Sequence, residues 1–253
     1  MLIYGHCHLD ADWFGSDIPN VIQNAKNSGV EAIVTSSITV DIHQTEIIVN
    51  TYPNFVFWAL GLHPPGVNSQ TVQMTAALIQ KYKAEIVAIG EVGLDYHWVK
   101  EEDLREQQKQ AFRLFINLAK DLEMPIVVHT RDAETDSIEI LEEEDAESVL
   151  MHCFSGTESE AKRIINNNWL ISVPTSVTNR KVHQTMARVV PLDLMLLETD
   201  APYLAPTKGR NESANIKISA QKIAEIKSTS FEEVARKTTC NARKFYRLNE
   251  RIE

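Results

Sequence analysis

The chain of 253 residues contains few of the residues that mark unusual protein classes. Its three cysteines are too few to form a disulfide framework as the main source of stability. Nine glycines and nine prolines exclude a collagen-like or low-complexity chain. Because 43% of the residues are hydrophobic and 24% are charged, the composition is that of an ordinary globular protein with a large core.

Long apolar runs are also missing. No segment approaches the ~18 uncharged apolar residues that span a membrane, so we expect no membrane association. The first ten residues, MLIYGHCHLD, have neither a basic segment nor an apolar block before a small-residue cleavage site. Together with the small number of cysteines, these absences predict a cytoplasmic protein.

Positive charge is scarce, since 25 lysines and arginines are outnumbered by 35 acidic residues and the formal net charge is −10. A chain of this sign is poorly suited to coating the phosphates of a long nucleic-acid duplex. It can still hold a nucleic acid locally, because bound metal cations supply positive charge that the side chains lack.

Short β-branched apolar segments recur along the chain, and an amphipathic helical pattern follows each of them. The predicted strands cover 2–5, 30–36, 55–61, 86–90, 125–129, 148–152, 169–174 and 194–198. Continuous apolar stretches such as IVAIG and IVVH are typical of parallel strands buried on both faces. Eight such units without a linker predict a (β/α)8 barrel, a TIM barrel, that spans residues 1–253 as a single domain. An open, doubly wound sheet is the alternative, since it has the same alternation.

The clearest helix is predicted over 103–123. Asp103 is its expected N-cap, with Glu106 three residues later as the capping-box partner, and Pro125 follows its end. Further helices are predicted over 17–28, 41–51, 71–83, 133–145, 157–168, 180–190, 214–227 and 230–246.

Histidines and acids gather at or just after the ends of the predicted strands. They are His6, His8, His63, Glu91, His129, His152 and Asp200. In a parallel barrel all of these ends lie on the carboxyl face, where active sites are built. His6 and His8 stand two residues apart, so a strand presents both imidazoles on one side. Taken alone, such a pair is more often structural, and it is the other five residues that favour a functional site.

Mixed imidazole and carboxylate donors are typical of sites for Zn, Mn, Fe or Ni, and carboxylate-rich positions also admit Mg. Six candidate ligands exceed the needs of one ion, so we expect Glu91, on a central strand, to bridge two divalent metals. The structural alternative is a buried Glu91 paired with a lysine or arginine. Gly90 and Gly93 allow close backbone approach beside it. We expect Asp95 to form the turn rather than to bind metal.

Six strings occur in a fixed order along the chain: HCHLD, GLHP, GEVGLDY, PIVVHTRDA, HCFSG and ETDAPYLAP. Together they resemble the TatD family of metal-dependent hydrolases and DNases, within the amidohydrolase-like TIM barrels, from residue 3 to residue 248. The resemblance implies two divalent metal ions (Mg, Mn or Zn) and a deoxyribonuclease that acts on DNA, single-stranded or at its ends. The metal ligands that it implies are His6, His8, Glu91 as the bridge, His129, His152 and Asp200.

Three positions depart from the family pattern. Tyr4 stands where an aspartate usually lies two residues before the first histidine of HxH. Pro65 follows GLHP where a further polar residue is common, and Ser213 replaces the proline of RNEP. The implied ligands are intact and the residues around them are altered.

The expected reaction is hydrolysis of a phosphodiester by a water that the metals activate. We expect Asp200 to ligate one ion and to take the proton of that water, with Glu91 as the other catalytic carboxylate.

We expect His63 to contact the substrate phosphate or the leaving oxygen, and Arg131 to bind phosphate through its guanidinium. A structural salt bridge with Asp132 or Glu198 is the equal alternative for Arg131.

Other functions are compatible with the same residues. A hydrolase of small esters, lactones or amides would use the same barrel, because an activated water also attacks carbonyl carbon. An inactive metal-binding protein is a second alternative. A basic rim would favour DNA, and its candidates are Lys162, Arg163, Lys208 and Arg210. Trp13 and Tyr203, in loops on the same face, are candidates for stacking on a base, with packing in the core or rim as their alternative.

Overall fold

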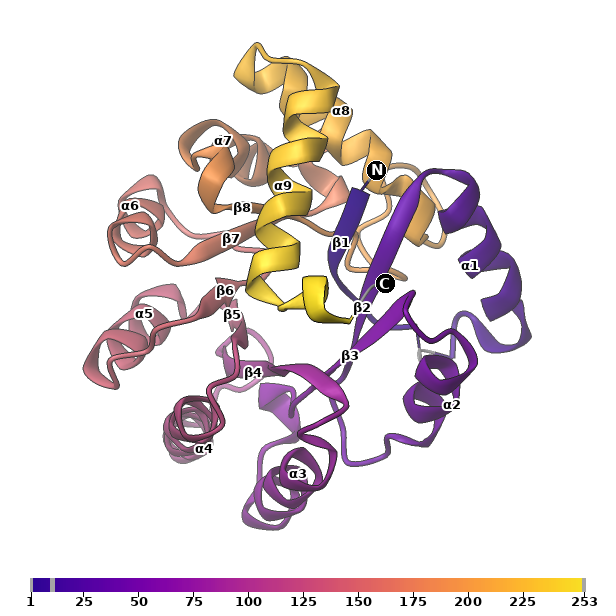
Figure 1. Ribbon diagram of the computed structural model, residues 1–253. Coiled ribbons are helices and arrows are strands. Elements are labelled where there is room, and N and C mark those ends of the chain that lie inside the picture. Colours follow the sequence, from indigo (N-terminus) through magenta and orange to yellow (C-terminus); the bar gives the residue numbers. More distant parts are fainter. Residues whose placement is uncertain (1, 10–11, 252–253) are drawn as a thin grey trace.

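The computed structural model describes residues 2–9 and 12–251, so Asp10, the last residue of the HCHLD string, lies outside the description. Eight parallel strands form one sheet in chain order and curl into a nearly closed barrel (Figure 1). The strands are β1 (Leu2–Cys7), β2 (Val30–Ser37), β3 (Val56–Leu60), β4 (Ile86–Asp95), β5 (Ile126–Arg131), β6 (Val149–Met151), β7 (Leu170–Val173) and β8 (Met195–Leu197).

The last strand returns to the first. Beyond the end of β8, the amide of Asp200 donates to the carbonyl of His6 at 3.3 Å, and the amide of His8 donates to the carbonyl of Ala201 at 2.8 Å. The predicted (β/α)8 barrel is therefore confirmed, and the open doubly wound sheet is wrong, because its strand order reverses near the centre.

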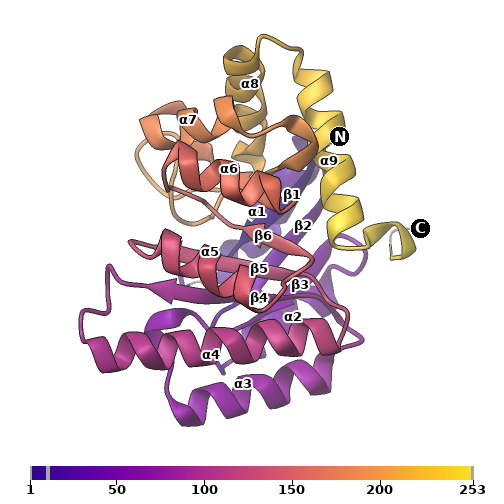
Figure 2. The same ribbon diagram turned by 90° about the vertical axis from the view of Figure 1, so that its left-hand side faces the viewer.

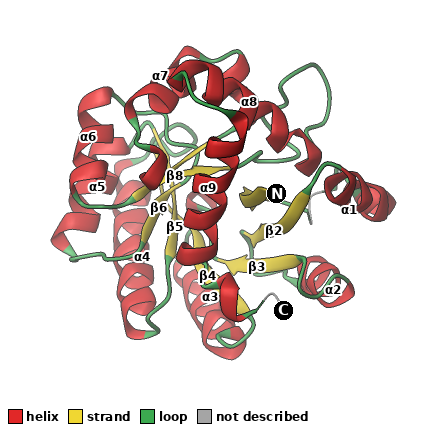
Figure 3. Cartoon of the chain, turned by 45° about the horizontal axis from the view of Figure 1, so that its top comes forward, coloured by secondary structure: helices red, strands yellow, loops and turns green. Residues whose placement is uncertain are grey.

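Helices surround the strands (Figure 3). They are α1 (Ile18–Asn27), α2 (His43–Thr51), α3 (Ser69–Tyr82), α4 (Glu102–Asp121), α5 (Glu134–Glu143), α6 (Glu158–Asn166), α7 (Lys181–Val189), α8 (Ile216–Lys227) and α9 (Phe231–Phe245). The predicted cap of α4 is wrong: the helix begins before Asp103, and its N-cap Glu101 makes no side-chain cap bond. Glu102 and Asp103 instead place negative charge in the first turn, where it interacts favourably with the positive end of the helix dipole and stabilises the helix. None of the helices in the described part is both long and apolar enough to cross a lipid bilayer.

The amino end of the barrel is closed by α9. Side chains that fill the inside of the barrel, among them Ile3, Val34 and Leu196, pack with Phe245 and Tyr246 in one buried cluster. The Tyr246 hydroxyl donates to the carbonyl of Gly5 at 2.6 Å. Figure 2 shows α9 along one end of the barrel. The carboxyl ends of the strands therefore form the face that is left for a site.

Strand β4 is five residues longer than predicted, so Glu91 lies inside it and not at its end. After an irregularity between Gly90 and Val92, its pairing with β5 continues from Gly93 opposite His129 to Asp95 opposite Arg131. The close approach depends on Gly93: with φ at 144°, a Cβ there would lie 2.1 Å from the carbonyl oxygen of His129. Because Gly93 has no side chain, β4 and β5, which both carry site residues, can pair closely at this point.

We expect Gly93→Ala to destabilise the protein more than Gly29→Ala. Both glycines have positive φ, at 144° and 82°, but a Cβ at Gly29 would meet nothing within 4 Å. Strained φ alone costs about 1–2 kcal/mol, and overpacking at Gly93 adds about 1–3 kcal/mol. Urea unfolding of both variants measures the difference, and equal free energies of unfolding would contradict the packing argument.

Candidate metal centre

The carboxylate of Glu91 lies at the centre of four histidines that stand in, or directly after, three other strands. Its Oε2 atom is 3.2 Å from His6 Nε2 and 3.4 Å from His8 Nε2. Its Oε1 atom is 2.6 Å from His129 Nδ1 and 3.5 Å from His152 Nε2. Each oxygen of this buried carboxylate therefore faces a different pair of imidazoles.

Ser36, near the end of β2, holds the outer nitrogens of the first pair. Its hydroxyl lies 3.1 Å from His6 Nδ1, and its carbonyl oxygen lies 3.3 Å from His8 Nδ1. Because the carbonyl only accepts, His8 Nδ1 carries the hydrogen of this bond, and the Nε2 atom is left to face the centre. This arrangement is typical of histidines that bind metal.

Buried acids hold the outer nitrogens of the second pair. His129 Nε2 bonds to Asp95 Oδ2 at 3.0 Å, and His152 Nδ1 bonds to Glu198 Oε2 at 3.1 Å. Glu198 in turn accepts a hydrogen bond from the Ser172 hydroxyl at 2.6 Å. Both rings are thus fixed in orientation, each with its other nitrogen directed at Glu91.

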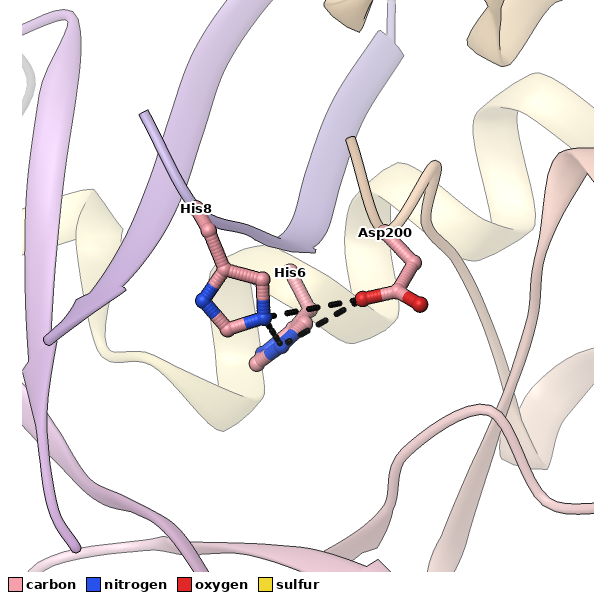
Figure 4. Close-up of side chains that lie close together, drawn as sticks. All are labelled: His6, His8 and Asp200. Atoms are coloured by element: carbon pink, nitrogen blue, oxygen red, sulfur yellow. Dashed lines mark hydrogen bonds and ion pairs between the residues drawn. The ribbon is translucent and has the colours of Figure 1, made fainter. Parts of the chain in front are cut away.

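Asp200 joins the first pair of histidines (Figure 4). Its Oδ1 atom lies 3.6 Å from His8 Nε2 and 4.0 Å from His6 Nε2, and both rings turn these nitrogens toward it. The residue has a left-handed backbone with φ at 57°, a conformation that costs non-glycine residues about 1–3 kcal/mol and that gathers at functional sites.

Tyr4 and Ser213, two of the departures from the family pattern, contact each other behind this turn. The Tyr4 hydroxyl lies 2.5 Å from Thr199 Oγ1 and accepts from the Ser213 hydroxyl at 3.4 Å. Thr199 Oγ1 also accepts from the Ala201 amide at 3.1 Å. Tyr4 therefore supports the turn that carries Asp200, from the position where the family usually has an acid.

The electrostatics of the centre are set by burial and by the histidines. Burial alone would raise the pKa of Glu91, but His152, His129 and His6 outweigh it and hold that pKa well below its usual range. Burial would likewise lower the pKa values of His129 and His152, yet the adjacent carboxylates raise both. Burial and the neighbouring His152 instead lower the pKa of His6, so only His129 and His152 are pushed toward the charged form.

The donors present fit divalent cations. Among the described residues, no lysine or arginine lies within ion-pair distance of the carboxylates of Glu91, Asp95, Glu198 and Asp200, which pair only with histidines. The alternative in which a buried Glu91 pairs with a lysine or arginine is therefore wrong. Its Oε2 atom is buried and accepts no hydrogen bond within the described chain, as expected of an atom that ligates an ion. Ligand-type atoms of His6, His8 and Asp200, and of His6, Glu91 and His152, lie within 4.8 Å of one another.

The two predicted substrate residues lie at the edge of this cluster. His63 Nε2 is 3.8 Å from Glu91 Oε1, and burial lowers the pKa of His63 to about 4, so the ring is neutral at pH 7. Arg131, at the end of β5, is exposed and lies over the Trp98 ring at 5.6 Å. Its predicted salt-bridge alternative is wrong, because Asp132 pairs with His97 and Glu198 with His152.

Two of the four residues of the predicted basic rim, Arg163 and Arg210, pair with acids of the chain. Arg163 pairs with Glu142 at 2.6 Å, and Arg210 pairs with Asp17 and with Glu212. These cations therefore neutralise acids of the chain itself. The alternative of core packing is wrong for Trp13 and Tyr203, which are both exposed.

Sequence reasoning missed the residues that orient the ligands. Asp95 forms the predicted turn by accepting from the Trp98 amide at 2.8 Å, but it also holds His129. Its spacing of four from Glu91 along a strand is a usable signal, since both side chains then lie on one side. Glu198 lies beyond the end of β8, so strand alternation gives no such signal for it. Ser36 offers no comparable signal.

Metal binding should release protons and should strengthen as pH rises. The adjacent carboxylates raise the pKa values of His129 and His152, which favours the doubly protonated form of both rings, and a ligand nitrogen must lose its proton. The apparent affinity for Mn²⁺ should increase about tenfold per pH unit for each proton displaced. Calorimetric titration at pH 6 and pH 8, in buffers of different ionisation enthalpy, counts the protons. Binding without proton release would contradict this account of the site.

Two curated relatives match this chain along almost its whole length. It is 39% identical to "Uncharacterized metal-dependent hydrolase YabD" of Bacillus subtilis, over 98% of this chain and 100% of that one. It is 36% identical to human "Deoxyribonuclease TATDN3", over 97% and 94%. A solved structure of a TatD family hydrolase from Entamoeba histolytica superposes with a TM-score of 0.87 at 25% identity, over 97% of each chain.

A second solved structure, the TatD homologue YJJV from Escherichia coli, has a TM-score of 0.88 at 23% identity and covers 97% of this chain and 98% of its own. At that identity the likeness bears on the fold alone. The model of the family described as TatD related DNase matches residues 5–247. The chain, with its histidine and carboxylate centre at the carboxyl end of a (β/α)8 barrel, belongs to the TatD family of metal-dependent hydrolases.

Proposed function

We propose that this protein is a deoxyribonuclease that hydrolyses phosphodiester bonds with two divalent cations, Mg, Mn or Zn. The observation that carries the proposal is the carboxylate of Glu91, whose two oxygens face two separate pairs of histidines. Membership of a family of DNases supports the phosphodiester as the bond that is cleaved.

The ligand assignment follows the two faces of Glu91. His6, His8 and Asp200 would hold one ion with Oε2, and His129 and His152 would hold the other with Oε1. The outer nitrogens of the histidine rings are already held by Ser36, Asp95 and Glu198, so the rings would need little reorganisation when the ions bind. When bound, such ions lower the pKa of water and polarise a phosphoryl oxygen.

Asp200 is the carboxylate best placed to accept a proton from the attacking water. Its side chain is 15% exposed, whereas that of Glu91 is 3% exposed, so only Asp200 extends toward the open face. Glu91 is enclosed by imidazoles and would act through the charge it places between the two ligand sets.

Two residues at the rim would position the phosphodiester. The neutral ring of His63 can donate one N–H to a phosphate oxygen or to the leaving oxygen. The guanidinium of Arg131, which makes no ion pair within the described chain, is free to form a bidentate contact with phosphate.

The proposed substrate is single-stranded DNA or a DNA end. The net charge of −10 and the engagement of Arg163 and Arg210 with acids leave little cationic surface for a long duplex. We also propose a cytoplasmic location, which is supported by the absence of disulfides among Cys7, Cys153 and Cys240.

Removal of metal should abolish hydrolysis. Protein dialysed against chelator should cleave neither single-stranded DNA nor a model phosphodiester, and Mg²⁺ or Mn²⁺ should restore both activities. A parallel panel of p-nitrophenyl esters and lactones tests the small-ester alternative. Esterase activity with no cleavage of either phosphodiester would overturn the nuclease proposal.

Asp200→Asn should lower kcat about 10²–10⁴-fold at saturating metal, because the amide cannot accept the proton. Asp193→Asn is the matched control, since Asp193 lies just before the start of β8, at the other end of that strand from Asp200, and pairs with Lys237 at the surface. Metal content measured by mass spectrometry separates a lost base from a lost ligand. A fully metallated Asp200→Asn with normal kcat would remove Asp200 from the base role.

A further inference from the structure

Three aromatic side chains are exposed in the described part of the chain, and all three lie at the carboxyl face. Trp98 is 66% exposed, Trp13 is 63% exposed and Tyr203 is 50% exposed. Each stands in a loop that follows a strand: β1 for Trp13, β4 for Trp98 and β8 for Tyr203. The large hydrophobic residues that are exposed elsewhere are aliphatic. Aromatic surface is thus concentrated around the metal centre.

Trp98 is tied to the metal centre through Asp95. The same carboxylate accepts from the Trp98 amide with Oδ1, at 2.8 Å, and bonds to His129 Nε2 with Oδ2, at 3.0 Å. The guanidinium of Arg131 lies 5.6 Å from the centroid of the indole, and the His97 ring meets that indole edge-on at 5.2 Å. The indole is therefore held in place by Arg131 and His97 while most of its surface remains exposed to solvent.

Tyr203 is fixed beside the other ligand set. Its amide donates to the carbonyl of Asp200 at 2.8 Å, and its own carbonyl accepts from Asn211 Nδ2 at 2.7 Å. Its ring centroid lies 6.1 Å from that of His8. Arg210 links this loop to Trp13, because its Nη1 atom donates to the Trp13 carbonyl at 3.1 Å.

These aromatic groups stand on opposite sides of the barrel mouth. Strands β8 and β1 meet at the seam, whereas β4 lies across the barrel from them in the strand order. The Glu91 centre lies between the two sides, since its ligands come from both. A phosphodiester at the centre would therefore have an aromatic ring available to the nucleoside on either side.

We propose, on the basis of the nuclease function above, that Trp98 on one side and Tyr203 with Trp13 on the other form two subsites that stack on unpaired nucleobases flanking the scissile phosphate. Stacking of a base on an aromatic side chain tolerates any sequence, because every base has a π-face. In an intact duplex the faces of the bases are occupied by their neighbours, so the subsites select single strands or frayed ends. Such contacts carry no charge, so they let an acidic protein bind DNA with a shallow salt dependence.

Intrinsic fluorescence tests the proposal directly. Trp58 and Trp169 are buried, so quenching by an added ligand reports on Trp13 and Trp98. The Mg²⁺-loaded protein is titrated with a single-stranded oligothymidylate whose phosphorothioate linkages resist hydrolysis. We expect quenching, and we expect Trp98→Phe to remove part of it with little loss of affinity, since phenylalanine still stacks.

Trp98→Ala should weaken binding roughly tenfold or more, whereas Leu114→Ala, which removes an exposed aliphatic side chain from α4, should not. An oligomer with abasic sites in place of the bases should bind the wild type and Trp98→Ala equally. Wild-type affinity in Trp98→Ala, or quenching that persists in the Trp13→Phe/Trp98→Phe double variant, would overturn the stacking subsites.

Hydrolysis measured on the unmodified oligomer separates this proposal from the one on which it rests. Metal-dependent hydrolysis without tryptophan quenching would overturn the subsites and uphold the nuclease. Quenching that depends on Trp98, with no hydrolysis of any phosphodiester, would uphold the subsites as a binding surface and overturn the nuclease.

Discussion

The burial of one carboxylate, Glu91, is the constraint to which the rest of the centre responds. An ionised carboxylate away from water needs opposite charge and hydrogen-bond donors around it. The chain meets that need with four imidazoles that stand in or directly after β1, β5 and β6, and no lysine or arginine of the described residues pairs with Glu91. Imidazoles can release their protons and bind cations instead, which an arginine cannot do. The same contacts that stabilise the metal-free protein thus become a ligand set.

The acids behind the histidines complete this arrangement. Asp95 and Glu198 are fully buried, and each holds the outer nitrogen of one ring. Together with Glu91 and Asp200 they concentrate negative charge at the carboxyl end of the barrel, where divalent cations are the natural complement. This local need for cations reconciles an acidic chain with an anionic substrate.

Residues that differ from the family pattern still support the turn that carries Asp200. Tyr4 and Ser213, which both differ from the family pattern, contact each other and, through Thr199, brace the turn of Asp200. Asp95 couples His129, a proposed metal ligand, to the exposed Trp98, so the centre and its rim are parts of one hydrogen-bonded unit. The barrel supplies the rigidity, and the loops after the strands supply the chemistry.

Local patterns in the sequence determined the alternation of strands and helices, the barrel, and the gathering of His6, His8, Glu91, His129, His152 and Asp200 at one face, because side-chain period and parallel strand direction are local properties. Only the tertiary structure decided which nitrogen of each ring faces inward, that β4 runs on to Asp95, and that Arg131 lies over Trp98. These features depend on distances between segments far apart in the chain. Gly93 shows the reason most clearly, because the atom that excludes a side chain there is the carbonyl oxygen of His129, which belongs to another strand.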